Sequence, residues 1–298
     1  MYDPYRGAIE SDKLYGLGSY DMKGGMGVCI EAFEKYTPKN FRLKLILCVD
    51  EENISRGGHH LLKSGEVDDA LCILSPEPAF DRGLQGITIG RMGRCLFDLT
   101  LKRESIHTMF YEPEKDLSLF LGDILHSFKK LYRKVDTKKQ FILARSIQSE
   151  VVGMSLPHLI TAELEASLIP PATVERVLNG LRETIKAISK KYDQSVACKV
   201  VLKKRETPFL NPYELDAKNV YLGAMKKSVK HVTEKDAEPY FRSSVADDNI
   251  WGAAGKTVLG IGPEGGNAHG PDEWVSIQSL KTLQKISMNF LEACEKLV

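Results

Sequence analysis

The chain of 298 residues lacks the features that point to a membrane or a nucleic acid. No apolar run approaches the ~20 residues that a membrane span needs. The N-terminal MYDPYRGAIE has neither the basic start nor the apolar core of a signal peptide. The 41 basic and 40 acidic residues leave a formal net charge of +1, which gives no electrostatic reason to expect nucleic acid or an anionic membrane as a partner.

Cysteine pairs of the CxxC type are also missing. The six cysteines are spread along the chain, and most of them lie inside apolar runs. Such spacing is typical of reduced, buried thiols in a protein of the cytoplasm. We therefore expect a cytoplasmic protein without a disulfide framework.

What the chain does contain is the pattern of a mixed α/β domain. Hydrophobic residues make up 43% of it, enough for a sizeable core. Residues 43–49 (LKLILCV) and 71–74 (LCIL) are nearly continuous apolar runs, which is typical of strands covered on both faces. A helical stretch around residues 60–63 separates them. This βαβ rhythm predicts a parallel or mixed sheet flanked by helices.

The pattern changes in the middle of the chain, where apolar and polar residues alternate as in half-exposed strands. The order of these elements is β-α-β-β-α-β, a ferredoxin-like unit. We predict an α/β catalytic domain made of residues 1–92 and 208–298, interrupted by a lid domain of residues 93–207. The expected lid elements are strands 95–102, 141–152, 159–168 and 197–202 and helices 117–135 and 174–192.

Five side chains in short turn-rich segments could carry chemistry: Asp21 in YDMKGG, Glu51 and Glu52 in VDEE, Glu77 in SPEP, and His269 in GGNAHGPDEW. Most of these segments follow a predicted core strand, and ligand sites assemble at the carboxyl ends of such strands. Carboxylates and an imidazole suit Zn²⁺, and a spare glutamate suits a general base.

Each of these residues also has a simpler interpretation. Asp21 could cap the following helix, Glu51 and Glu52 could be solvated, Glu77 could lie in a surface turn, and His269 could be an ordinary loop residue. A phosphate-binding loop at residues 14–25 is the weaker alternative, because LYGLGSYDMKGG matches neither GxxxxGK[ST] nor GxGxxG.

The segments LYGLGSYDMKGG, VDEE, SPEP, GITIGRMGR and GPEGGNAHGPDEWV occur in an order that resembles the co-catalytic zinc amidohydrolases and exopeptidases. That family includes acetylornithine deacetylase, succinyl-diaminopimelate desuccinylase, aminoacylases and glutamate carboxypeptidases. The resemblance implies hydrolysis of the amide bond of an N-acylated amino acid or short peptide. It also implies two Zn²⁺ per subunit, with Co²⁺ or Mn²⁺ as alternatives, and a homodimer joined through the lid.

The resemblance assigns roles to the same residues. Asp21 corresponds to the carboxylate that bridges two metals, Glu52 and His269 to terminal ligands of one metal, and Glu77 to a ligand of the other. Glu51 corresponds to the general acid/base. His107 in ESIHTMF corresponds to a histidine that reaches the partner subunit's site and stabilises the oxyanion.

Two features of the family pattern are missing. The family's first metal ligand, a histidine in an HxD segment, would precede a stretch that resembles YDPYRG, and no such segment is present. We therefore expect one metal site to be incomplete and interpret the chain as shortened. The third lid strand has no arginine to bind a substrate carboxylate, for which Arg145 and Arg242 are candidate substitutes. The alternative function is a binding or regulatory protein with impaired catalysis, or an inactive fragment.

Overall fold

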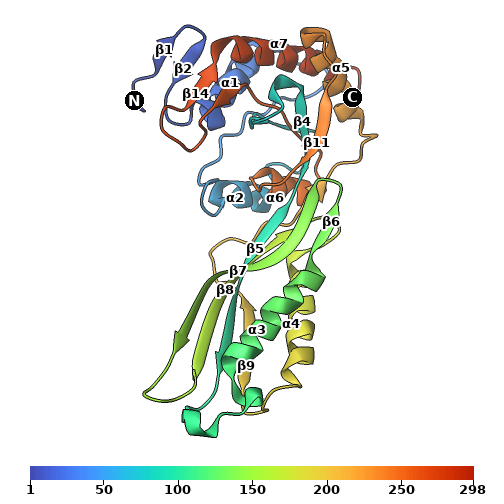
Figure 1. Ribbon diagram of the computed structural model, residues 1–298. Coiled ribbons are helices and arrows are strands. Elements are labelled where there is room, and N and C mark those ends of the chain that lie inside the picture. Colours follow the sequence, from blue (N-terminus) through green and yellow to red (C-terminus); the bar gives the residue numbers. More distant parts are fainter.

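The two ends of the chain come together in one part of the molecule, and the middle of the chain forms a second, elongated part (Figure 1). The computed structural model describes residues 1–298. It confirms the predicted class, an α/β catalytic domain with an inserted lid domain. None of the helices combines the length and the apolarity needed to cross a bilayer.

The sheet of the catalytic domain is mixed, as predicted. Parallel pairs join β3 to β12 and β11 to β4, whereas β10 runs antiparallel to β4. The sheet order is β10-β4-β12-β3, with β11 beside β4. The strands are β3 (Ile73–Ser75), β4 (Gly86–Arg91), β10 (Tyr213–Glu214), β11 (Glu238–Arg242) and β12 (Val258–Gly260).

Helices cover both faces of this sheet (Figure 1). Successive residues of a strand face opposite sides, and in β12 Leu259 and Val258 belong to two different core clusters. The Leu259 cluster packs against α1 (Gly24–Lys35), α5 (Val220–Thr233) and α7 (Ile277–Cys294). The Val258 cluster packs against α2 (Arg56–Ser64) and α6 (Asp248–Ala253).

A second, smaller sheet links the N-terminal region to the C-terminal region. Its order is β1-β2-β14-β13, and β14 pairs antiparallel with β2. The strands are β1 (Ala8–Glu10), β2 (Lys13–Tyr15), β13 (Gly265–Gly266) and β14 (Trp274–Ser276). This sheet places the turn after β2, which contains Asp21, beside the loop between β13 and β14, which contains His269.

The lid consists of a five-stranded antiparallel sheet with two helices. Its strand order is β6-β7-β8-β5-β9. Helices α3 and α4 pack on the sheet face from which Phe97, Leu99 and Leu164 are buried. The elements are β5 (Gly93–Lys102), α3 (Leu117–Leu131), β6 (Arg133–Val135), β7 (Lys138–Glu150), β8 (Leu159–Leu168), α4 (Val174–Ser189) and β9 (Ala197–Leu202).

Some element boundaries differ from the predicted ones. The helix expected over 117–135 ends at Leu131, because residues 133–135 pair with residues 138–140 in a hairpin. The helix expected over 174–192 ends at Ser189. The lid therefore contains one strand more than the ferredoxin-like order requires.

The prediction of a buried strand at residues 43–49 was wrong. None of the backbone amides of this run donates a backbone hydrogen bond. Ile46, Leu47 and Val49 are 37%, 55% and 69% exposed. A strand requires a neighbouring strand to satisfy its N–H and C=O groups, and the sheet ends at β3 without pairing to this run. Apolar composition was therefore not sufficient to make a strand here.

Candidate metal centre and catalytic site

Asp21 lies in a tight turn, Ser19–Lys23, between β2 and α1. No side chain caps this turn or α1, so the interpretation of Asp21 as a helix cap was wrong. Directly after this turn, α1 (Gly24–Lys35) begins close to the segment that carries Glu77. A Cβ on Gly25 would lie 2.4 Å from the carbonyl oxygen of Pro76. Only glycine allows α1 to begin this close to Pro76.

A buried carboxylate holds the Asp21 turn in place. Glu273, which is 3% exposed, accepts hydrogen bonds from the backbone N–H groups of Gly18 (2.7 Å) and Tyr20 (3.0 Å). It also accepts one from the N–H of Asp21. Glu273 was not predicted to take part in the site. The signal available was its position in GPDEW, four residues after His269.

Three of the predicted ligands converge. The Nε2 atom of His269 lies 3.2 Å from Oδ2 of Asp21 and 3.0 Å from Oε1 of Glu52. The ligand atoms of the three residues all lie within 4.8 Å of one another. Two carboxylates and one imidazole are a donor set that fits Zn²⁺ and similar divalent ions, with a coordination position left open.

Glu77 is buried rather than exposed in a surface turn, and it is not among the three residues whose ligand atoms converge. Its Oε2 lies 3.4 Å from Nη2 of Arg91 and 3.4 Å from Nη1 of Arg242. Burial raises the pKa of Glu77 to about 7, although Arg91 acts in the opposite direction. Arg91 was not predicted to take part in the site, and Arg242 was predicted only as a candidate to bind a substrate carboxylate. A charged residue at the end of the apolar strand β4 was the available signal for Arg91.

Glu51 lies near three other acidic side chains, those of Glu77, Glu52 and Asp247. Burial, together with the neighbouring carboxylates of Glu77 and Glu52, raises its pKa to about 8. Glu52, by contrast, has a side chain that is 68% exposed and points to His269. The two adjacent glutamates therefore occupy different environments, one partly buried and one open to solvent.

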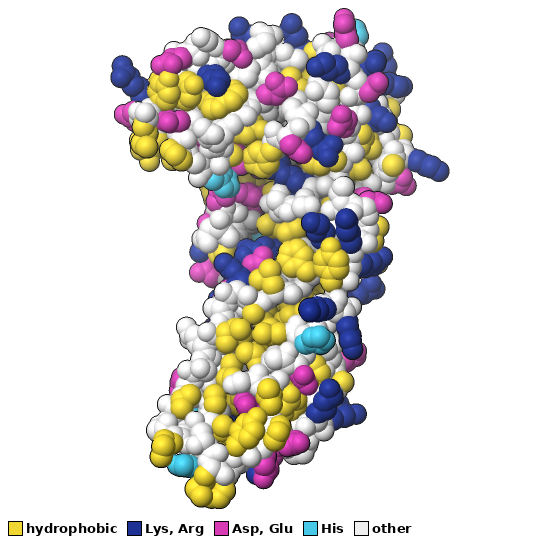
Figure 2. All heavy atoms as spheres, viewed as in Figure 1, with side chains coloured by type: hydrophobic (Ala, Val, Ile, Leu, Met, Phe, Trp, Pro, Cys, Tyr) yellow, Lys and Arg dark blue, Asp and Glu magenta, His cyan; other side chains and the backbone are white.

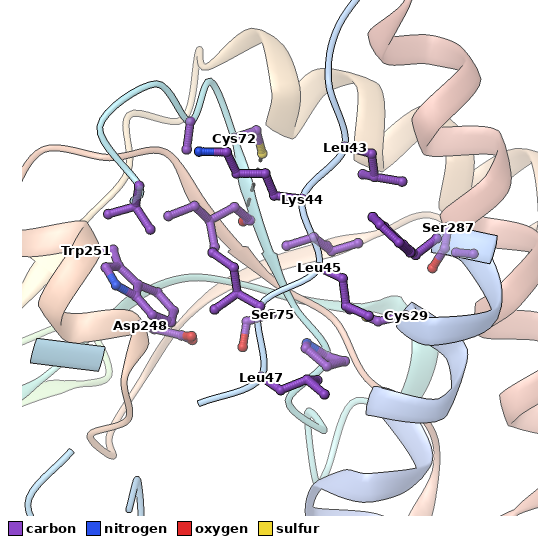
Figure 3. A pocket seen from close by; sticks show the side chains of 18 of the residues that line it. Cys29, Leu43, Lys44, Leu45, Leu47, Cys72, Ser75, Asp248, Trp251 and Ser287 are labelled. Carbon is purple, nitrogen blue, oxygen red and sulfur yellow. Dashed lines mark hydrogen bonds between the residues drawn. The ribbon is translucent and has the colours of Figure 1, made fainter. Parts of the chain in front are cut away.

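The acidic cluster borders a large apolar cavity of about 710 Å³. Asp21, Glu51 and Glu77 line it together with many hydrophobic side chains. In Figure 3, Leu43, Leu45 and Leu47 of the unpaired run line the cavity together with Cys29 of α1 and Ser287 of α7. The unpaired run thus forms a wall of the cavity without joining the sheet.

Three predicted residues lie away from this cluster or are otherwise engaged. His107 begins a short turn, Thr108–Phe110, after β5 has run to the far end of the lid (Figure 1). Arg145 of the lid sheet lies 3.3 Å from Glu163 and 3.4 Å from Glu165. Arg242 is buried and donates to the carbonyl of Pro78 at 2.8 Å. Neither arginine is available as a free cation for a substrate carboxylate.

Comparison with known proteins identifies a family that matches nearly the whole chain. The model of peptidase family M20/M25/M40 matches residues 1–293. Succinyl-diaminopimelate desuccinylase from Helicobacter pylori is 27% identical over 302 residues, which cover 97% of this chain and 75% of that protein.

Two solved structures share the fold. Aminopeptidase PepT from Bacillus cereus has a TM-score of 0.75 at 11% sequence identity, covering 96% of this chain and 75% of that one. A dinuclear metal-binding peptidase of the M20 family from Bacillus subtilis has a TM-score of 0.69 at 12% identity, covering 92% and 71%.

Proposed function

Since the chain belongs to peptidase family M20/M25/M40 and is a metal-dependent hydrolase, we propose that it cleaves the amide bond of an N-acylated amino acid or a short peptide. Asp21, Glu52 and His269 hold a divalent ion, Zn²⁺ in the first instance. Asp21 and Glu77 contribute to a second site. The observation that carries the proposal is the convergence of the first three side chains beside Glu51.

The position of each residue supports the role that we propose for it. A bound divalent ion supplies Lewis acidity, which polarises the substrate carbonyl and acidifies water. Glu51 takes a proton from the attacking water and passes it to the leaving amine, as a general acid/base. Arg91 and Arg242 hold Glu77 in place through its Oε2. Glu273 holds the turn that presents Asp21.

The proposal is tested by combining zinc analysis with hydrolysis assays on N-acetyl amino acids, N-succinyl amino acids and dipeptides. We expect the wild type to bind zinc and to hydrolyse at least one class. Glu51→Gln should keep the zinc and lose about 10²- to 10⁴-fold in rate. Glu175→Gln, an exposed residue of α4, is the matched control and should behave as wild type.

Two outcomes contradict the proposal. If no zinc binds at neutral pH in the absence of chelator, the metal assignment fails. If zinc binds but wild type and Glu51→Gln hydrolyse every substrate at the same rate, the assignment of Glu51 fails.

The lid favours substrates with an uncharged acyl group. On the exposed face of its sheet, Arg94 forms two hydrogen bonds of 2.9 Å with Glu165, and Arg145 lies beside the same carboxylate. Lys203 pairs with Glu163. Because these cations already have carboxylate partners, an acidic acyl group finds no free cation among them. N-acetyl substrates should therefore be hydrolysed faster than N-succinyl ones.

A homodimer through the lid is part of the same proposal. Strand β6 pairs only with residues 138–140 of β7, so the outer edge of β7 beyond them is free to pair with another strand. Figure 2 shows hydrophobic side chains exposed along the lid, and Leu143 and Ile147 of β7 are 42% and 49% exposed. In such a dimer His107 acts at the partner subunit's site.

Light scattering tests the dimer. Ile147→Lys should shift the wild-type dimer toward monomer, whereas Val220→Lys, an exposed position on α5, should not. A wild-type protein that is monomeric at micromolar concentration contradicts this part of the proposal.

All six cysteines are unpaired, which supports a reducing compartment, and we place the enzyme in the cytoplasm.

A further inference from the structure

Residues 203–208 return the chain from the lid to the catalytic domain, and we name them the hinge segment. They lie against the loop of residues 50–55, which carries Glu51 and Glu52. Nη2 of Arg205 donates hydrogen bonds to the carbonyl oxygen of Ile54 (2.9 Å) and to Oγ1 of Thr207 (2.7 Å). The hydroxyl of Thr207 in turn donates to the same Ile54 carbonyl. One carbonyl of the loop therefore receives two donors from the hinge segment.

A second contact joins the hinge segment to the other end of the loop. Nε and Nη2 of Arg56 donate to Oε2 of Glu206 at 3.0 and 2.9 Å. Nη1 of Arg56 also donates to Oδ2 of Asp50 at 3.0 Å. Arg56 thus connects the first residue of the loop to the hinge segment.

The loop needs such support from outside. Both Asp50 (φ 69°) and Ser55 (φ 56°) have left-handed backbone conformations, which non-glycine residues keep only where the surrounding structure holds them. Within the loop, the N–H of Ser55 donates to the carbonyl of Asp50 at 2.7 Å. The preceding residues 43–49 belong to no sheet, so they do not anchor the loop as a strand would.

The hinge segment itself is fixed to the lid. The N–H of Lys203 donates to the carbonyl of Leu96 in lid strand β5 at 2.9 Å, and the N–H of Arg94 donates to the carbonyl of Leu210 at 2.9 Å. The guanidinium of Arg205 lies 4.7 Å from the ring centre of Phe209, a buried residue shared with the lid core. A rotation of the lid therefore moves Arg205 and Thr207 together.

We propose that Arg205 and Thr207 are positioning residues that couple the orientation of the lid to the loop bearing Glu51 and Glu52. They act through the carbonyl of Ile54, so the lid and the two carboxylates move as a linked unit. The inference rests on the proposed function in assigning Glu52 to the metal and Glu51 to proton transfer. The mechanical link itself rests only on the contacts between the hinge segment and the loop.

Thr207→Val is the decisive variant, because it removes the hydroxyl and keeps the shape of the side chain. Thr207→Ser restores the hydroxyl and serves as the rescue. Lys204→Gln, an exposed neighbour in the hinge segment, is the matched control. Arg205→Lys keeps the charge and removes the forked geometry, and it is the second variant if Thr207→Val does not fold.

Two measurements are made on each variant. Hydrogen exchange of the metal-free protein should be faster for the amides of residues 51–56 in Thr207→Val and Arg205→Lys, and unchanged in Thr207→Ser and Lys204→Gln. Competition with a chelator should show zinc affinity lowered by about 10- to 100-fold in the same two variants, as for other residues that orient a ligand.

The outcomes separate the two proposals. Folded variants with wild-type exchange in residues 51–56 overturn the coupling. Faster exchange with no zinc binding in any variant, including the wild type, supports the mechanical link and overturns the metal assignment. Faster exchange with wild-type zinc affinity shows that the loop moves without affecting Glu52, which also overturns the proposed positioning role.

Discussion

Oε1 of Glu273 accepts a hydrogen bond of 2.9 Å from the backbone N–H of Asp21. The two residues come from opposite ends of the chain and meet because β14 pairs with β2. With Tyr20 and Gly18 as further donors, one buried carboxylate satisfies three amides of the turn. The orientation of Asp21 therefore depends on a residue that does not belong to the metal cluster.

Glu273→Gln should weaken zinc binding without removing any proposed ligand. A glutamine has only one acceptor oxygen and an NH₂ group that faces the backbone donors, so at least one N–H of the turn loses its partner. We expect zinc affinity to fall by about 10- to 100-fold, measured by competition with a chelator. Glu292→Gln on α7, whose side chain is exposed, is the control. Equal affinity in the two variants would show that the turn holds Asp21 without Glu273.

The buried ion pair between Arg91 and Asp248 should contribute strongly to stability. Arg91 is fully buried, and its Nε donates to Oδ2 of Asp248 at 2.8 Å. Removing one partner of a buried pair leaves a charge without compensation, so Asp248→Asn should lower the free energy of unfolding by about 3 kcal/mol. Urea unfolding measures this effect.

The control for Asp248 is an exposed ion pair of the same domain. Glu238 lies 2.9 Å from Arg82, and its side chain is 60% exposed. Because solvent screens such pairs, Glu238→Gln should cost less than about 1 kcal/mol. A similar loss in both variants would contradict the distinction between the two pairs.

The sequence allowed a good prediction of the lid and a poorer one of the catalytic domain, for a physical reason. In β8 the alternation of Ile160, Ala162 and Leu164 with polar residues predicts which face is buried whatever the neighbouring strand is. Residues 43–49 are apolar on both sides, and such a run becomes a strand only if another strand pairs with it. Composition contains no information about that partner.

The same reason explains which parts of the site were missed. Asp21, Glu52 and His269 lie in short motifs that stand out in the sequence, and the structure brings them together. Arg91 and Glu273 act through partners that are distant in the chain. A single sequence does not show those pairings, so residues that support the site look like ordinary charged residues.

The unpaired state of residues 43–49 can be tested by amide hydrogen exchange. Amides without hydrogen bonds exchange quickly, whereas those of a paired central strand are protected. We expect the amides of residues 43–48 to exchange within the first time points, and those of β5, which pairs on both sides with β8 and β9, to remain protected. Protection of residues 43–48 comparable to that of β5 would show that the run forms a strand in solution.

The stability of the lid should depend on pH through Glu165. The hydrogen bonds from Arg94, helped by the charges of Arg94 and Arg145, hold the pKa of Glu165 below its usual value of 4.5. A carboxylate with a lowered pKa stabilises the folded state above its unfolded-state pKa, and this contribution disappears as the pH falls through the folded-state pKa.

Glu165→Gln should therefore reduce the free energy of unfolding at pH 7, and the difference from wild type should shrink below about pH 4.5. Urea unfolding at pH 7 and pH 3 measures both differences, with Glu183→Gln on the exposed side of α4 as the control. A difference that does not change with pH would mean that Glu165 stabilises the lid by packing and not by its charge.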